Sequence, residues 1–181
     1  MTSAGPGPMR EDEEMTEHET AHLIVMRHAK AQSTAADDHE RRLTDRGETD
    51  ARAAGEWLVA AGWRPDLLLV SSAARARQTA ELVATALGSA PEVVVIDELY
   101  DADAPEVVRI CAERVGADVG SAAVVGHNPT MVELALLLME SDDHEVRLRP
   151  GSLAVLELRQ SWEQLRAGGA RLADRFSPRG D

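Results

Sequence analysis

Residues 22–28 read His-Leu-Ile-Val-Met-Arg-His, an apolar run that ends in an arginine and a histidine side by side. A continuous apolar run of this length predicts a strand buried on both faces, as in a parallel sheet covered by helices. In such sheets, ligands bind beyond the carboxyl ends of the strands. Arg27 can bind a phosphate group there, and His28 can attack one. Two residues are a weak signal alone, so the rest of the chain decides their meaning.

The chain after this run alternates between strand and helix patterns. The first strand covers residues 21–26, and further strands are predicted at 67–70, 92–96, 122–125, 153–158 and 171–176. Helices are predicted at 44–62, 75–87, 105–115 and 129–139. Thr44 is the expected N-cap of the first helix, and Gly62 and Gly88 are expected to end the first two. Alternating strands and helices predict a three-layer α/β/α domain with a mainly parallel sheet.

Composition narrows the class of protein. The 181 residues suffice for one domain, and a content of 44% hydrophobic but 3% aromatic residues predicts a core of Ala, Val and Leu. The only cysteine, Cys111, excludes an intramolecular disulfide and lies on an apolar helical stripe, so we expect it in the core. No run approaches the ~20 apolar residues of a membrane span. No secretory signal is visible either, which favours a cytoplasmic protein.

The charged residues bear on the class of partner and on the expected domain boundaries. The formal net charge is −13, from 19 Lys and Arg against 32 Asp and Glu, which argues against nucleic-acid binding. Residues 1–19 combine Gly and Pro with a run of acidic residues and predict a disordered acidic tail. We expect the domain at 20–177 and a short tail at 178–181.

Three predicted strand ends carry side chains with complementary chemistry. Arg27 and His28 follow the first strand, Arg75 follows the second, and His127 follows the fourth. Because parallel strands end at one edge of the sheet, we expect these four side chains to converge. Two guanidiniums and an imidazole can stabilise a transferring phosphoryl group, and a neutral histidine can accept it.

The neighbouring polar residues have plainer interpretations. Asn128 is the expected N-cap of the fourth helix, with Pro129 at its first position, so this helix start favours a nearby anion. Lys30 and Arg77 are expected at the rim of the site or in solvent, Arg41 could reach the site, and Arg46 is expected in the first turn of its helix. The other histidines lack comparable partners and are expected at the surface; they are His18, His22, His39 and His144.

Together these residues resemble the histidine phosphatase (phosphoglycerate-mutase-like) superfamily. The resemblance covers about residues 21–160 and rests on Arg27-His28-Ala29, on Ser72-x-x-Arg75-Ala76-x-Gln78-Thr79-Ala80 and on Gly126-His127-Asn128. The segment 38–47 also resembles the family's loop and helix start. The short length, without an inserted cap domain, is most similar to the SixA-type phosphohistidine phosphatases.

The resemblance implies roles for the four residues. His28 would be the nucleophile, Arg27 and Arg75 would bind the phosphoryl oxygens, and His127 would complete the phosphate site, with Asn128 beside it. Water would then hydrolyse the phosphohistidine intermediate. The resemblance implies neither a metal nor an organic cofactor.

The proton donor is the part of the pattern that aligns least well. Larger relatives supply an acidic residue after the third strand, where Glu98 and Asp101 are the candidates here. An alkoxide leaving group needs such an acid, whereas a protonated imidazole leaves more readily. The sequence therefore favours a phosphatase acting on phosphohistidine in proteins. The alternatives are a phosphatase for small phosphate esters and a phosphate-binding domain without turnover.

Overall fold

The computed structural model describes residues 20–139 and 146–179. Within them, the chain forms a six-stranded sheet in the order β3-β2-β4-β1-β5-β6. The strands are β1 (His22–Arg27), β2 (Leu67–Ser71), β3 (Glu92–Ile96), β4 (Ser121–Gly126), β5 (Leu153–Leu158) and β6 (Ala170–Phe176). The helices are α1 (Asp45–Ala61), α2 (Ala74–Leu87), α3 (Ala104–Arg114) and α4 (Thr130–Leu138), with short 3-10 turns η1 (Asp97–Tyr100) and η2 (Trp162–Gln164).

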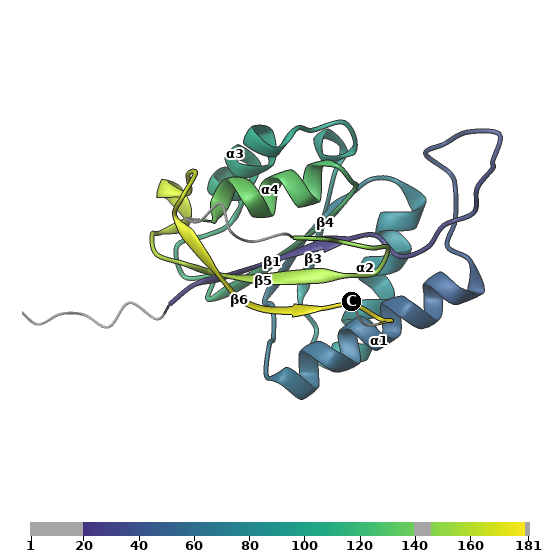
Figure 1. Ribbon diagram of the computed structural model, residues 1–181, viewed down its shortest axis with the longest axis horizontal. Helices are drawn as coiled ribbons and strands as arrows, with labels where there is room; N and C mark the ends of the chain where they lie inside the picture. Colours follow the sequence, from purple (N-terminus) through teal and green to yellow (C-terminus); the bar gives the residue numbers. More distant parts are fainter. Residues whose placement is uncertain (1–19, 140–145, 180–181) are drawn as a thin grey trace, which may run out of the picture.

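The sheet is the middle of three layers, as the alternation of strands and helices predicted. Helices α3 and α4 cover one face, and α1 and α2 cover the other (Figure 1). Strand β1 shows why its run is continuously apolar. Leu23 and Val25 pack toward α3 and α4, whereas Ile24 and Met26 pack toward α1 and α2. Burial on both faces removes the polar alternation that a half-exposed strand would have.

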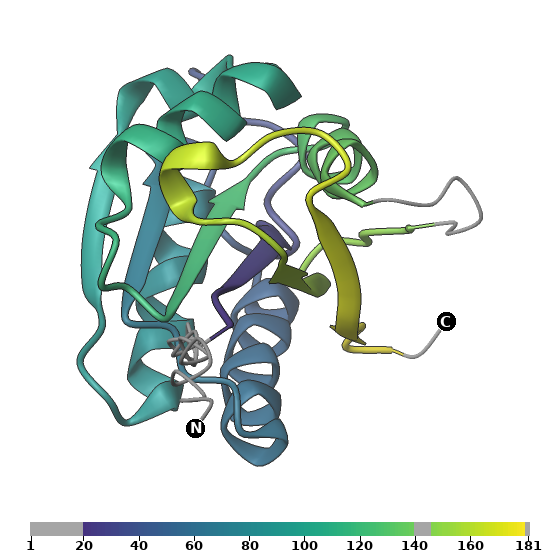
Figure 2. The same ribbon diagram turned by 90° about the vertical axis from the view of Figure 1, so that its left-hand side faces the viewer.

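The prediction of a mainly parallel sheet is confirmed, with two strands adding a mixed edge. Strands β3, β2, β4 and β1 pair in parallel, and β5 pairs antiparallel with both β1 and β6. One detail of the prediction is wrong. Strand β3 is the outer strand beside β2, and Val93 and Val95 are 45% and 49% exposed. Figure 2 shows this edge of the sheet. An apolar run therefore did not mean burial on both faces here, because Val94 packs against the core on one face while Val93 and Val95 lie outside the hydrophobic cluster of the other face.

Helix ends follow the local sequence with one exception. The side chain of Thr44 accepts the Gly47 N–H and caps α1, and Gly62 and Gly88 end α1 and α2 in left-handed conformations. The prediction for α4 is wrong by one residue. Pro129, and not Asn128, occupies the N-cap position. The side-chain amide of Asn128 instead donates to the carbonyl of Leu148 at 2.9 Å, so it does not cap the helix.

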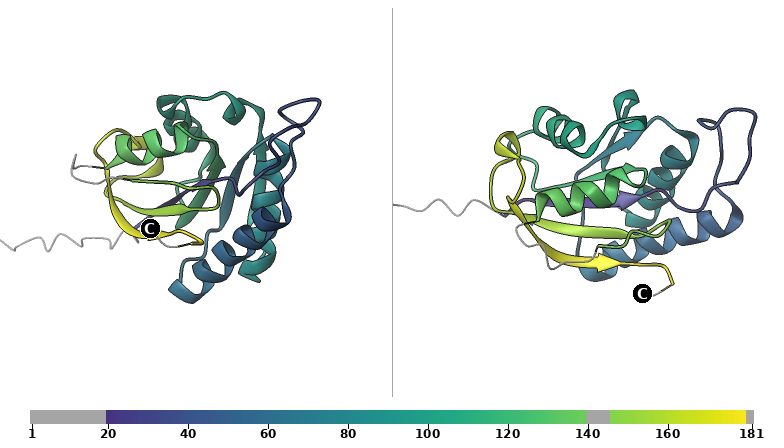
Figure 3. Two further views of the ribbon diagram at one scale, coloured as in Figure 1. Left: turned by 45° about the vertical axis from the view of Figure 1, so that its right-hand side comes forward. Right: turned by 45° about the horizontal axis from the view of Figure 1, so that its top comes forward.

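The connection between β1 and α1 stands out from the body of the molecule. It follows the carboxyl end of β1 and projects from that edge of the sheet (Figure 3). Its return is held by the Thr44 N–H, which donates to the Lys30 carbonyl at 2.9 Å, and by the Ala74 N–H, which donates to the His39 carbonyl at 2.9 Å. The loop is therefore docked against the start of α2.

The structure also bears on the predictions for the cysteine, for membrane spans and for the N-terminal tail. Cys111 is fully buried in the core, as expected, and burial raises the pKa of its thiol to about 12. No helix in the described part of the chain has the length and apolar character to cross a membrane. The predicted acidic tail at 1–19, His18 and His144 lie outside the described residues.

Candidate active site

His28 lies directly after β1 and is held in one orientation by the backbone. Its Nδ1 lies 2.7 Å from the carbonyl oxygen of Ala29. A carbonyl oxygen only accepts hydrogen bonds, so Nδ1 carries the proton and Nε2 keeps its lone pair. Burial lowers the pKa of His28 to about 3, which keeps the ring neutral near pH 7. The neutral ring with a free Nε2 is compatible with the predicted role of His28 as a nucleophile, which stays a prediction.

The two predicted arginines reach the same place from β1 and α2. The guanidinium of Arg27 donates from Nη1 to the Leu148 carbonyl at 3.1 Å. Arg75 is only 5% exposed, although arginine at a helix start is usually solvated. The positive charges of Arg75 and Arg27 both lower the pKa of His28, behind the larger effect of burial. Both guanidinium charges therefore act on the His28 ring.

His127 follows β4 and completes the predicted set. Its ring centroid lies 5.2 Å from that of His28. Its Nε2 lies 2.8 Å from the hydroxyl of Ser71, the last residue of β2. Burial, followed by the charge of Arg75, lowers the pKa of His127 to about 4. Parallel pairing of β1, β4 and β2 is what brings these strand ends together.

Unused hydrogen-bonding atoms gather on these residues. Within the described residues, buried atoms without a hydrogen-bond partner include Nε of Arg27, Nε of Arg75, Nδ1 of His127 and Oδ1 of Asn128. Buried polar atoms are normally paired because desolvation without a partner costs about 1–3 kcal/mol. The two guanidinium N–H groups are donors that suit the oxygens of a phosphoryl group. The arrangement can therefore bind such a group beside the free Nε2 of His28.

Two residues at the rim of the site were missed by the sequence analysis. The carboxylate of Asp38 accepts a hydrogen bond from Nη2 of Arg75 at 3.1 Å and another from the hydroxyl of Tyr100 at 2.8 Å. The Tyr100 ring meets the His127 ring edge-on, with centroids 5.6 Å apart. The bond from Tyr100, together with Arg75 and Arg41, lowers the pKa of Asp38, so this carboxylate is ionised at neutral pH. The resemblance of segment 38–47 to the family loop was the signal that pointed to this region.

The prediction that His39 is a surface residue without partners is wrong. Its Nε2 lies 3.0 Å from the hydroxyl of Ser72, and its ring lies edge-on to Tyr100 at 4.9 Å. His22 was also expected at the surface, but it is partly buried, with its ring centroid 4.9 Å from that of Trp63. His39 lies in the loop between β1 and α1, and its contacts with Ser72 and Tyr100 arise only in the tertiary structure. His22 is partly buried because its ring packs against that of Trp63.

The candidate acids flank Tyr100 in the sequence and are not bonded to the site histidines. Glu98 and Asp101 are exposed, and within the described residues neither forms a hydrogen bond or ion pair with His28 or His127. Tyr100, between them in sequence, is the residue of this segment that contacts the site. Their role as proton donors stays a prediction.

The other cationic side chains considered for the site lie at its border or outside it. Arg41 donates from Nε to Asp38 at 2.7 Å and so borders the site through that carboxylate. Arg46 lies in the first turn of α1, as expected, 3.6 Å from Asp50. Arg77 and Lys30 are exposed and line separate pockets beside the rim. In residues 20–139 and 146–179, no group of three or more His, Cys, Asp or Glu side chains is placed to hold a metal.

Comparison with known families is consistent with this arrangement. Residues 23–117 match the histidine phosphatase superfamily (branch 1). The chain belongs to this superfamily. It is a phosphatase, and the described residues show no inserted cap domain, in agreement with the resemblance seen in the sequence.

Relatives and solved structures extend the match over most of the phosphatase. An uncharacterised protein of Mycobacterium tuberculosis is 37% identical over 85% of this chain and 100% of its own length. A Nakamurella multipartitia structure assigned to the SixA phosphohistidine phosphatases is 32% identical, with a TM-score of 0.78 over 88% of this chain and 96% of that chain. A structure of the protein histidine phosphatase SixA complexed with tungstate is 26% identical, with a TM-score of 0.76 over 87% of this chain and 97% of that chain.

Proposed function

We propose that this phosphatase removes the phosphoryl group from phosphohistidine in proteins, through a phosphohistidine intermediate at His28. The observation that carries the proposal is the contact between Nδ1 of His28 and the Ala29 carbonyl, which leaves Nε2 free in a neutral ring. Similarity to the SixA phosphohistidine phosphatases supports the substrate class. We assign the activity to a domain at residues 20–177.

The reaction balances in two displacements. In the first, Nε2 of His28 forms a bond to phosphorus while the bond from phosphorus to the substrate nitrogen breaks, and the substrate imidazole leaves with a proton. In the second, water attacks the phosphorus and the bond to Nε2 breaks, which releases inorganic phosphate and restores His28. The guanidiniums of Arg27 and Arg75 stabilise the negative charge on the phosphoryl oxygens in both steps. His127, with Asn128 beside it, completes the phosphate site.

The rim favours a nitrogen leaving group over an alkoxide. The carboxylate nearest to Arg75 is that of Asp38, and its lowered pKa keeps it from donating a proton at neutral pH. Glu98 and Asp101 are exposed and form no hydrogen bond or ion pair with the site histidines within the described residues. An ester substrate needs protonation of its leaving oxygen, whereas a phosphohistidine ring can leave already protonated.

Trapping tests the proposal directly. The wild-type chain and the His28→Ala variant are mixed briefly with a labelled phosphohistidine protein, quenched in alkali and analysed for labelled enzyme. We expect an alkali-stable, acid-labile label on the wild type and none on His28→Ala. The matched control is His22→Ala, a half-buried histidine at the other end of β1, which should label like the wild type. Equal labelling of wild type and His28→Ala would overturn the assignment of the nucleophile.

A substrate panel separates the alternatives. The wild-type chain is assayed on the phosphohistidine protein and on sugar, nucleotide and aryl phosphates at equal concentration. A higher kcat/KM on the phosphohistidine protein supports the proposal. A higher value on a small ester would favour the phosphomonoesterase, and phosphate binding without any turnover would favour a binding domain.

A further inference from the structure

A second cluster of positive charge lies beside the candidate active site. Lys30, Arg46, Arg149 and Arg179 line a pocket of about 170 Å³, together with Asp50. We call it the cationic pocket. Four cations meet there although the chain as a whole carries a net charge of −13.

The carboxylate in the pocket accounts for only part of this charge. Asp50 is 5% exposed, and its two oxygens lie 3.6 Å from Arg46 and 3.3 Å from Arg179. The Lys30 side chain is exposed and forms no hydrogen bond or ion pair with the part of the chain that the structure describes. One buried carboxylate is therefore shared by Arg46 and Arg179, and the charge of Lys30 adds to the pocket without a partner among the described residues.

The cationic pocket shares its loops with the phosphate site. Lys30 lies two residues after His28. On the other wall, the Gly151 N–H donates to the carbonyls of Arg27 and His28 at 3.3 and 3.2 Å, two residues after Arg149. Both walls of the cationic pocket are therefore continuous with the backbone at His28.

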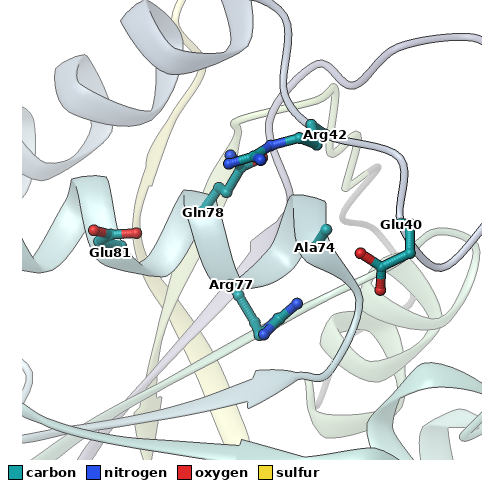
Figure 4. A pocket seen from close by; sticks show the side chains of 6 residues that line it. All are labelled: Glu40, Arg42, Ala74, Arg77, Gln78 and Glu81. Carbon is teal, nitrogen blue, oxygen red and sulfur yellow. The ribbon is translucent and has the colours of Figure 1, made fainter.

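A second pocket near the rim shows that clustered arginines do not always leave excess charge. It has a volume of about 240 Å³ and lies along the start of α2, where Arg42 and Arg77 are matched by Glu40 and Glu81. Figure 4 shows the guanidinium of Arg77 extending toward the carboxylate of Glu40. The charges in this pocket are balanced, so it provides a matched control for the cationic pocket.

We propose that the cationic pocket binds a carboxylate side chain of the protein substrate while His28 accepts the phosphoryl group. The proposal rests on the proposed function and adds a preference for acidic residues close to the phosphohistidine. Salt screens fields beyond about 8 Å under physiological conditions, so the pocket acts on groups near the phosphoryl group. The rest of this acidic chain would repel an acidic partner, which makes the pocket the favourable point of contact.

Paired peptides test the preference. Two phosphohistidine peptides differ only in that glutamates beside the phosphohistidine are replaced by glutamines in the second. We expect Lys30→Gln to lower kcat/KM for the glutamate peptide about twofold to fivefold, as for an exposed charge pair, and to leave the glutamine peptide unchanged. Lys30→Arg should restore the preference, and Arg77→Gln in the balanced pocket should not alter it. Equal effects of Lys30→Gln on both peptides would overturn the proposal.

Binding without turnover separates this proposal from the catalytic one. The unphosphorylated glutamate peptide is titrated into the His28→Ala chain and into His28→Ala with Lys30→Gln, at low and at high salt. Tighter binding to the chain that keeps Lys30, lost at high salt, supports the pocket whether or not the enzyme hydrolyses phosphohistidine. Identical binding by the two chains would overturn the pocket even if hydrolysis is observed.

Discussion

The hydroxyl of Ser71 lies 2.8 Å from Nε2 of His127, and it joins the ends of β2 and β4 across 56 residues of sequence. Ser71 is fully buried, and Nδ1 of His127 has no partner among the described residues. When the Ser71 hydroxyl donates to Nε2, the proton of the neutral ring resides on Nδ1. We therefore propose that Ser71 is a positioning residue, which fixes the tautomer of His127 at the proposed phosphate site.

Replacing Ser71 by alanine should weaken both the fold and catalysis. The Ser71→Ala variant leaves Nε2 of His127 buried without a partner, which costs about 1–3 kcal/mol of unfolding free energy. A ring free to adopt either tautomer should lower kcat about fivefold to tenfold, as expected for one lost hydrogen bond. Denaturant unfolding and steady-state kinetics measure the two effects. Ser72→Ala is the control, because its hydroxyl contacts His39. A normal kcat in Ser71→Ala would contradict the positioning role.

Removing the charge of Asp38 should change the titration of Tyr100. The hydrogen bond to Asp38 raises the pKa of the Tyr100 hydroxyl above its ordinary value of 10. The Asp38→Asn variant removes the negative charge, so the pKa of Tyr100 should fall back toward that value. Tyr100 is the only tyrosine in the chain, so ultraviolet absorbance reports tyrosinate without overlap. Glu40→Gln is the control, and the same titration in Asp38→Asn as in wild type would show that the contact is absent in solution.

The two site histidines should make the fold less stable in acid. Burial lowers the pKa of His28 to about 3 and that of His127 to about 4, whereas the unfolded chain has ordinary values near 6.5. Between these values the unfolded state binds more protons, so stability rises with pH in this window. The contribution is complete above pH 6.5 and is lost as the pH falls through about 4 for His127 and about 3 for His28.

Thermal unfolding across this range measures the effect. The midpoint of the wild type should fall between pH 6.5 and pH 4 more steeply than that of His28→Asn, which lacks one of the titrating rings. Carboxylates titrate in both proteins, so the difference between the two curves isolates the histidine. Parallel curves would mean that His28 is not buried as a neutral ring.

Alanine at Gly47 should destabilise α1 although alanine favours helices. The intrinsic preference of a helix for alanine over glycine is about 1 kcal/mol. At Gly47, however, a Cβ would lie 2.1 Å from the Lys30 carbonyl oxygen, which is backbone and cannot move alone. We expect Gly47→Ala to lose about 1–3 kcal/mol, as in overpacked sites. Glu48→Ala, at an exposed position in the same turn, should be near neutral by urea unfolding. A stabilised Gly47→Ala would show that the loop after His28 yields easily.

Local signals explain why most of the fold was predictable. The Thr44 side chain and the left-handed glycines Gly62 and Gly88 act within a few residues of the helix ends that they define. The apolar run of β1 reflects burial on both faces. Because connected parallel strands end at one edge, Arg27, His28, Arg75 and His127 could be grouped from their strand positions. These are properties of short segments and of general sheet geometry.

Contacts between distant segments explain where the structure differs from the predictions made from the sequence. The Tyr100 hydroxyl reaches Asp38 across 62 residues, and Asn128 leaves its expected N-cap place because the Leu148 carbonyl accepts its amide. The exposure of β3 depends on its place at the edge of the sheet. Each outcome depends on which segment packs nearby, and no local pattern encodes that choice.

The sequence by itself therefore determined the strands, the helices and the grouping of the four candidate site residues, because periodicity, capping and parallel pairing act locally or through general rules. Only the tertiary structure decided that Asp38 and Tyr100 border Arg75 and His127, and that positive charge collects around Lys30. Those arrangements depend on how loops from different strands pack against one another, since hydrogen bonds and screened charges act over distances that sequence separation does not reveal.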